Sequence, residues 1–156
     1  YPLESVAMMN RIMLNTESSL VDMIEHASPK VADGVQLVTS AVVYGAARIA
    51  DRLEAKLVVI ATRTGNTARI KAKQRDYIPT VGVSRNLSTL RQLCLFWGII
   101  PLRGMPLESG EELRAAVECW GREQELLTDG DYAVFVTSST FGTLGHDELF
   151  VHQIED

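Results

Sequence analysis

The chain has 156 residues, of which 46% are hydrophobic and 22% are charged. This is about the length of one domain, and the composition excludes a disordered chain, a collagen and a coiled coil. The net charge of −5 argues against a nucleic-acid or anionic-membrane partner. Cys94 and Cys119 lie in apolar helical patterns, so we expect reduced core residues in a cytoplasmic protein.

The first 26 residues predict a helix, since apolar residues recur at helical spacing over 3–26, with a break near 15–19. Four of the five methionines, Met8, Met9, Met13 and Met23, fall here. A methionine-rich stripe is typical of adaptable packing, so we expect this helix to pack on another domain. The chain opens with Tyr1 rather than Met, which we interpret as a cut within a longer chain.

A second helix is predicted over about 29–54, because Ser28 and Pro29 form a helix-start signal before apolar residues with a 3.6-residue period. Gly34 and Gly45 weaken this helix by roughly 1 kcal/mol each relative to alanine, so we expect close packing to explain them. Trp97 and Trp120, near the ends of later helices, are expected to be packing anchors.

From residue 56 onward, short β-branched runs alternate with helical patterns. The runs predict strands at 56–61, 80–83, 99–102, 132–137 and 148–154, and the helical patterns lie at about 65–74, 86–97 and 109–127. The last two strands are joined by a loop too short for a helical crossover, so that pair should be antiparallel. The sequence therefore predicts an α/β fold: a three-layer αβα sandwich with a mostly parallel five-stranded sheet and an antiparallel last strand.

The strongest candidate site is the segment Thr62-Arg63-Thr64-Gly65-Asn66-Thr67, between the first of these strands and the next helix. A helix N-terminus supplies N–H donors, glycine lets backbone approach a ligand, and arginine adds a charged fork. These features predict a phosphate or carboxylate site at the carboxyl end of a parallel strand. An ordinary helix-capping turn with exposed threonines fits the same pattern. A second polar loop over 138–145, which contains Gly142 and Thr143, is placed to cover an anion held by the first.

Basic residues concentrate in and after this segment, where five of the fifteen fall within thirteen positions: Arg63, Arg69, Lys71, Lys73 and Arg75. We interpret those of the helix as a solvated face and Arg63, in the turn itself, as the exception. The three histidines have no metal-ligand spacing, and neither cysteines nor serines lie in a nucleophile motif. We therefore predict no metal site and no catalytic residue.

At this point residues 55–102 resemble the C-terminal domain of pyruvate kinase. The shared pattern is a strand, Thr-x-Ser/Thr-Gly-x-Thr/Ser-Ala, a basic helix, a strand with Val-Thr/Ser-Arg-Asn, a helix with Arg-Gln and a Gly-x-x-Pro segment. The matching residues are Thr62, Thr64, Gly65, Thr67, Ala68, Val83, Ser84, Arg85, Asn86, Arg91, Gln92, Gly98 and Pro101. The opening Tyr-Pro-Leu-Glu-Ser-Val is similar to the segment that opens the last helix of that family's catalytic barrel.

The resemblance implies that residues 1–27 are the end of the barrel with a connecting helix, and that 28–156 are the C-terminal domain. It implies a glycolytic parent enzyme that transfers phosphate from phosphoenolpyruvate to ADP and assembles as a homotetramer. Its site residues, with Mg²⁺ and K⁺, would lie in the barrel that precedes this chain. The chain alone would then hold no cofactor and be inactive.

The resemblance also implies a role in allosteric regulation for the candidate loop, which in many members binds a phosphate of a sugar phosphate. That role maps to Thr62, Arg63, Thr64, Gly65, Asn66 and Thr67, with Gly142 and Thr143 from the second loop. Asp147 and Glu148 depart from the family pattern and would oppose a second phosphate. The effector is then a monophosphate, another anion or nothing. A stand-alone module that binds a phosphometabolite is the alternative to a part of an enzyme.

Overall fold

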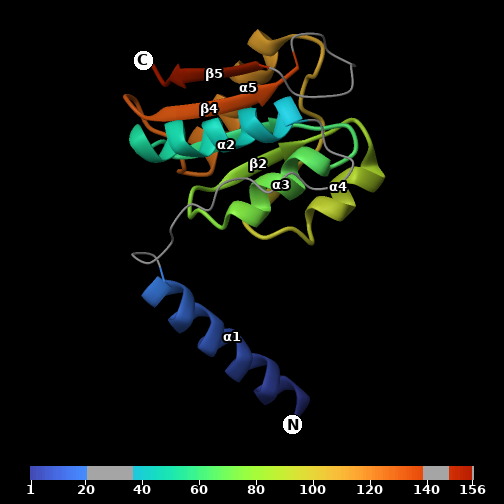
Figure 1. Ribbon diagram of the computed structural model, residues 1–156, viewed down its shortest axis with the longest axis vertical. Helices are drawn as coiled ribbons and strands as arrows, with labels where there is room; N and C mark the ends of the chain where they lie inside the picture. Colours follow the sequence, from blue (N-terminus) through green and yellow to red (C-terminus); the bar gives the residue numbers. More distant parts are fainter. Residues whose placement is uncertain (21–36, 139–147, 156) are drawn as a thin grey trace.

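The computed structural model describes residues 1–20, 37–138 and 148–155, and within them five strands form one sheet (Figure 1). The strands are β1 (Leu57–Ala61), β2 (Thr80–Val83), β3 (Ile99–Leu102), β4 (Tyr132–Thr137) and β5 (Glu148–Gln153). Their order is β3-β2-β1-β4-β5, and every neighbouring pair is parallel except β4 and β5. The predicted sheet, including its antiparallel last strand, is confirmed.

The described helices are α1 (Pro2–Leu20), α2 (Leu37–Arg52), α3 (Asn66–Gln74), α4 (Leu87–Leu93) and α5 (Gly110–Glu123). Residues 29–36 of the predicted second helix, with Gly34, lie outside the described part of the chain. The predicted helices over 86–97 and 109–127 are too long. After α4 the amides of Leu95 and Phe96 bond three residues back, which tightens the chain toward β3. After α5, Glu125 adopts a left-handed φ of 57° and the carbonyl of Gly121 accepts the amides of Leu126 and Leu127.

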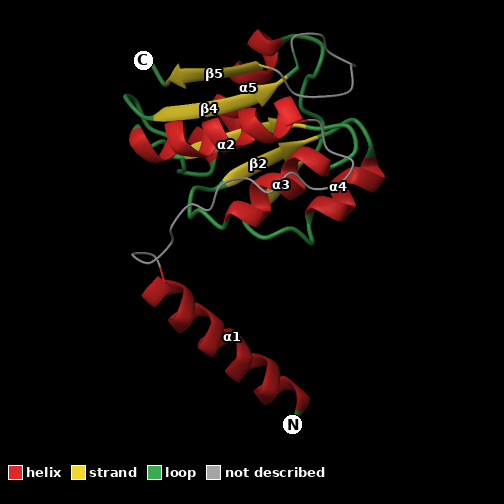
Figure 2. Cartoon of the chain, in the orientation of Figure 1, coloured by secondary structure: helices red, strands yellow, loops and turns green. Residues whose placement is uncertain are grey.

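The helices cover both faces of the sheet and make three layers (Figure 2). One face carries α2, α3 and α4, where Val43 and Ala46 of α2 pack on Val58 and Ile60 of β1. The other face carries α5, whose buried residues recur every four positions as Leu113, Val117 and Gly121. The strands β1 and β2 are buried on both faces, which is why β1 is a continuous apolar run and β2 contains no charged residue.

The α4 helix packs against the sheet over a glycine of β2. A Cβ atom added to Gly82 would lie 2.6 Å from Cδ1 of Leu93 and 3.1 Å from Cγ2 of Ile99. Leu93 is fully buried in this contact. The backbone of Gly82 therefore serves as the surface on which α4 is seated.

The N-terminal helix α1 projects away from the sheet, and its apolar side chains face solvent (Figure 1). Leu3 is 79% exposed and Ile12 is 58% exposed. The expectation that this helix packs on another domain stays a prediction. None of the described helices combines the length and hydropathy needed to span a membrane.

Two packing predictions are wrong. Cys94 and Cys119 are free thiols, but both are exposed rather than in the core. Cys119 lies two residues from Val117, and so on the far side of α5 from the buried stripe, because two residues rotate a helix by about 200°. Gly45 was expected to mark close packing, yet a Cβ atom there would meet nothing within 4 Å.

Two glycine substitutions test the seat of α4. We expect Gly82→Ala to lower the free energy of unfolding by about 1 to 3 kcal/mol, since the added methyl overlaps Leu93. The matched control is Gly45→Ala, which should raise it by about 0.5 to 1 kcal/mol because the site is open and helical. Urea unfolding followed by circular dichroism measures both. A Gly82→Ala protein as stable as the wild type would contradict the prediction.

Candidate functional site

The predicted loop 62–67 forms a tight turn between β1 and α3. The amide of Thr62 continues the ladder by donating to the carbonyl of Val83, at 2.8 Å. The Thr62 hydroxyl then accepts the amide of Gly65 at 3.0 Å, in a buried position. Gly65 has a φ of +83°, a conformation that favours glycine, and it caps the N-terminus of α3. Thr62 and Gly65 thus build the frame of the turn.

The start of α4 supplies a second support for the turn, one that the sequence pattern did not predict. Both Asn86 Nδ2 and Thr89 Oγ1 donate to the carbonyl of Arg63, at 3.1 and 2.8 Å. Asn86 precedes α4 and Thr89 lies in its first turn. The sequence held a weak signal, since Asn86 is part of the resembling motif, but the contact depends on β2 lying beside β1. The backbone of Arg63 is therefore fixed by the helix that follows the adjacent strand.

The loop separates a buried frame from an exposed contact surface. Thr62, Gly65 and Thr67 are buried, whereas the side chains of Arg63, Thr64 and Asn66 are exposed. All six predicted residues in this loop are therefore brought together, with three facing solvent. Gly142 and Thr143, predicted from the second loop, lie outside the described residues.

The electrostatics of this turn favour an anion. Gly65, the N-cap residue of α3, makes no side-chain capping bond, and the first turn of this helix carries no acidic residue. A helix N-terminus bears partial positive charge, and the exposed guanidinium of Arg63 adds a full one immediately before it. The arrangement can therefore hold a phosphate or carboxylate through charge and backbone donors.

The topology places the loop where open α/β sheets bind ligands. From β1 the chain runs outward through β2 to β3, and it then returns to β4 on the other side of β1. The carboxyl ends of β1 and β4 therefore flank a point where the strand order reverses. Thr62 follows β1 at this edge and Thr137 ends β4, where its hydroxyl donates to Glu148 at 3.3 Å.

The far end of α3 contains a buried ion pair, which corrects the prediction of a solvated basic face. Lys71 Nζ lies 2.5 Å from Asp76 Oδ1, and both side chains are buried. Burial lowers the pKa of Lys71, while the charge and hydrogen bond of Asp76 oppose that shift. Arg69 and Lys73 are exposed as expected. Lys71 differs because a partner just beyond the helix draws it inward.

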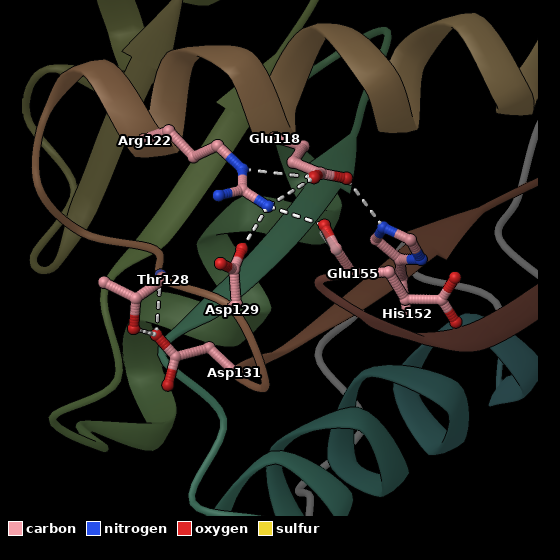
Figure 3. A network of polar contacts seen from close by, with 7 residues as sticks. All are labelled: Glu118, Arg122, Thr128, Asp129, Asp131, His152 and Glu155. Carbon is pink, nitrogen blue, oxygen red and sulfur yellow. Dashed lines mark hydrogen bonds and ion pairs between the residues drawn. The ribbon is translucent and has the colours of Figure 1, made fainter.

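A second polar cluster joins α5 to the C-terminal strand at the amino edge of the sheet, opposite the 62–67 loop (Figure 3). Glu118 accepts from Arg122 at 3.2 Å and contacts His152 Nε2 at 2.9 Å. Arg122 also pairs with Asp129 at 2.6 Å and donates to the carbonyl of Glu155. The hydrogen bond with His152, assisted by Arg122, lowers the pKa of Glu118.

This cluster is a structural clasp rather than a metal centre. The described residues contain no group of three or more His, Cys, Asp or Glu side chains able to hold a metal ion. Glu118 and His152 are separated by 34 positions in the chain, so only the pairing of β5 with β4 brings them together.

Comparisons with protein families, with curated proteins and with solved structures all match this chain to pyruvate kinases. The family described as "Pyruvate kinase, alpha/beta domain" matches residues 40–151. Pyruvate kinase 2 of Synechocystis is 30% identical over 96% of this chain, and the pyruvate kinase of Sporosarcina psychrophila is 32% identical over all of it. This chain covers 24% and 27% of those proteins. A pyruvate kinase structure from Cryptosporidium parvum aligns with a TM-score of 0.78 and 22% identity, over 98% of this chain and 30% of that one.

The clasp predicts a pH dependence. The pKa of Glu118 is lower in the folded state than its ordinary 4.5, so the unfolded chain binds the proton more readily and stability falls as acid protonates the carboxylate. We expect Glu118→Gln to lower the free energy of unfolding by about 0.5 to 1 kcal/mol at pH 5.5 and by little at pH 3. Urea unfolding at both pH values measures the difference. The control is Glu125→Gln, at an exposed carboxylate just beyond the same helix, and an equal loss at both pH values would contradict the prediction.

Proposed function

Because the chain belongs to the pyruvate kinase alpha/beta domain family, we propose that it is the regulatory and assembly domain of a pyruvate kinase and binds a phosphorylated metabolite at the 62–67 loop. The chain covers 24% and 27% of two relatives, so the parent's reaction and partners belong to this proposal. The parent would convert phosphoenolpyruvate and ADP to pyruvate and ATP in the cytoplasm. Mg²⁺ and K⁺ would bind in its catalytic barrel, outside this chain.

One observation carries the ligand proposal: an exposed arginine stands at the N-terminus of α3, on a backbone fixed by residues at the start of α4. Arg63 offers the charge, and its carbonyl is held by Asn86 and Thr89. Thr64 adds an exposed hydroxyl beside it. A preorganised cationic turn of this kind suits a phosphate group, because little order is lost on binding.

The assembly proposal is supported by the N-terminal helix. The apolar residues of α1 face solvent over most of its length, with Val6 at 64% and Met9 at 59% exposed. Apolar side chains in such a row are typical of an interaction surface. In the proposed parent, residues 1–27 are the end of the catalytic barrel with a connecting helix, and the domain contributes to a homotetramer.

Titration calorimetry with glucose 6-phosphate and fructose 1,6-bisphosphate tests the ligand proposal. Arg63→Ala should weaken binding about tenfold, because a charge-assisted hydrogen bond contributes about 1.5 to 3 kcal/mol. Thr64→Ala should weaken it about threefold, through a neutral hydrogen bond worth about 0.5 to 1.5 kcal/mol. Arg52→Ala is the control, since Arg52 is exposed at the end of α2, where the chain enters the amino edge of the sheet. Failure of the wild-type chain to bind either sugar phosphate would refute the proposal.

A second experiment tests whether the chain has catalytic activity of its own. The chain should show no conversion of phosphoenolpyruvate and ADP to pyruvate in an assay coupled to lactate dehydrogenase, because the proposal places the reaction in the barrel. Turnover by the purified chain would contradict that assignment. The alternative, a stand-alone phosphometabolite-binding module, predicts the same inactivity. It is distinguished by the genomic sequence upstream of Tyr1, which would then encode no barrel.

A further inference from the structure

A cavity lies at the amino edge of the sheet, opposite the 62–67 loop, between the segments that lead into β2 and β3. Its volume is about 310 Å³. The described residues that line it include Asp76, Tyr77, Pro79, Trp97, Ile99 and Ile100. A cavity of this volume is at the lower end of the range that binds small molecules.

The walls of this cavity are mainly apolar and aromatic. The rings of Tyr77 and Trp97 meet edge to face, with centroids 5.7 Å apart. Their donors are already used, because the Tyr77 hydroxyl donates to the carbonyl of Glu17 at 3.0 Å and Trp97 Nε1 donates to Glu17 Oε1 at 3.3 Å. Neither ring therefore has a hydrogen-bond donor left for a ligand, and both offer apolar surface.

One carboxylate lines the cavity with an oxygen that has no partner. Asp76 is 7% exposed, and Lys71 Nζ donates to its Oδ1. Its Oδ2 is buried and accepts from no group in the described part of the chain. Buried polar atoms are normally hydrogen-bonded, since an unpaired one has lost its water without a replacement. An N–H or O–H group held in the cavity would supply the missing donor.

The surrounding charges decide which kind of donor fits. Lys71 is buried together with Asp76 and balances its charge. Arg75, 5.1 Å from the centroid of the Trp97 ring, and Glu17, at the Nε1 atom of that ring, also offset each other. A cationic ligand would bring in a charge without a counter-ion and bear its desolvation cost. An anionic ligand would be repelled by the carboxylate, so an uncharged donor fits best.

We propose that this cavity binds a small, uncharged aromatic molecule that donates one N–H or O–H hydrogen bond to Oδ2 of Asp76. The ring of the ligand packs against Tyr77 and Trp97, where aromatic pairs add to the apolar contact. Indoles and phenols have this chemistry, whereas phosphorylated metabolites do not. The site is separate from the 62–67 loop, so it does not rest on the proposed function.

A matched pair of probes tests the hydrogen bond. Indole and 1-methylindole share one ring system, and the methyl group removes the N–H donor. Titration calorimetry on the wild-type chain should show indole binding about tenfold more tightly, because a hydrogen bond to a charged acceptor is worth that factor or more. Benzyl alcohol should likewise bind more tightly than the benzylammonium ion, which has the same ring and a charged donor.

Two variants and a control locate the site. Lys71→Met combined with Asp76→Leu removes the carboxylate without leaving a buried charge unpaired, and this chain should bind indole and 1-methylindole equally. Trp97→Ala should weaken the binding of both probes about fivefold, through the loss of the ring contact. Leu95→Ala, two residues away at a side chain that is 85% exposed, should change neither. Circular dichroism checks that each variant is folded.

The outcomes are decisive for the cavity alone. Equal affinities of the wild-type chain for indole and 1-methylindole overturn the proposal, as does tighter binding of the benzylammonium ion. A preference for indole that persists in the double variant also overturns it, because the acceptor then lies elsewhere. If the double variant does not fold, the two probe pairs and Trp97→Ala still decide. Failure of all probes to bind the wild-type chain overturns this site and leaves the proposed function, tested with sugar phosphates, standing.

Discussion

The close seat of α4 on the sheet is the contact on which the candidate site depends. Gly82 leaves room for Leu93, and a Cβ atom in its place would lie 2.6 Å from that side chain. The packing of Leu93 over Gly82 positions α4 on the sheet. In this position the hydroxyl of Thr89 lies 2.8 Å from the carbonyl of Arg63. A loop between a strand and a helix is otherwise free to take many shapes, at an entropic cost on binding. Here the neighbouring βα unit fixes its shape in advance.

The strands were predictable because burial on both faces leaves a plain signature, a continuous run such as Leu57–Ala61. The helix ends were less predictable, because the turns after α4 and α5 depend on where β3 and β4 lie in the folded sheet. The sequence predicts a buried Cys119, whereas the thiol is exposed. An apolar pattern does not define to within one residue which side of a helix is buried. The sequence predicts an exposed Lys71, whereas the side chain is buried against Asp76. Asp76 lies beyond the end of the helix, so helical periodicity does not reveal the ion pair.

The candidate site was predictable to the extent that it is one continuous segment. Residues 62–67 form a single turn, so spacing alone brings them together. Their supports were not predictable, since Asn86 and Thr89 reach Arg63 only when β2 lies beside β1. The same holds for His152 and Glu118, which meet because β5 runs antiparallel to β4. A site made of neighbouring residues in the sequence can be predicted before the fold is known. Contacts between residues that lie on different strands and helices cannot.

Two arginines of the fold, Arg122 and Arg63, are placed differently with respect to acidic groups, and the difference favours a ligand at the loop. At the amino edge Arg122 pairs with Glu118 and Asp129. At the carboxyl edge, Arg63 is exposed beside a helix N-terminus that has no acidic residue in its first turn. A cation in that position is opposed by the helix dipole. A bound anion offsets this repulsion, which is the electrostatic argument for a ligand at the loop.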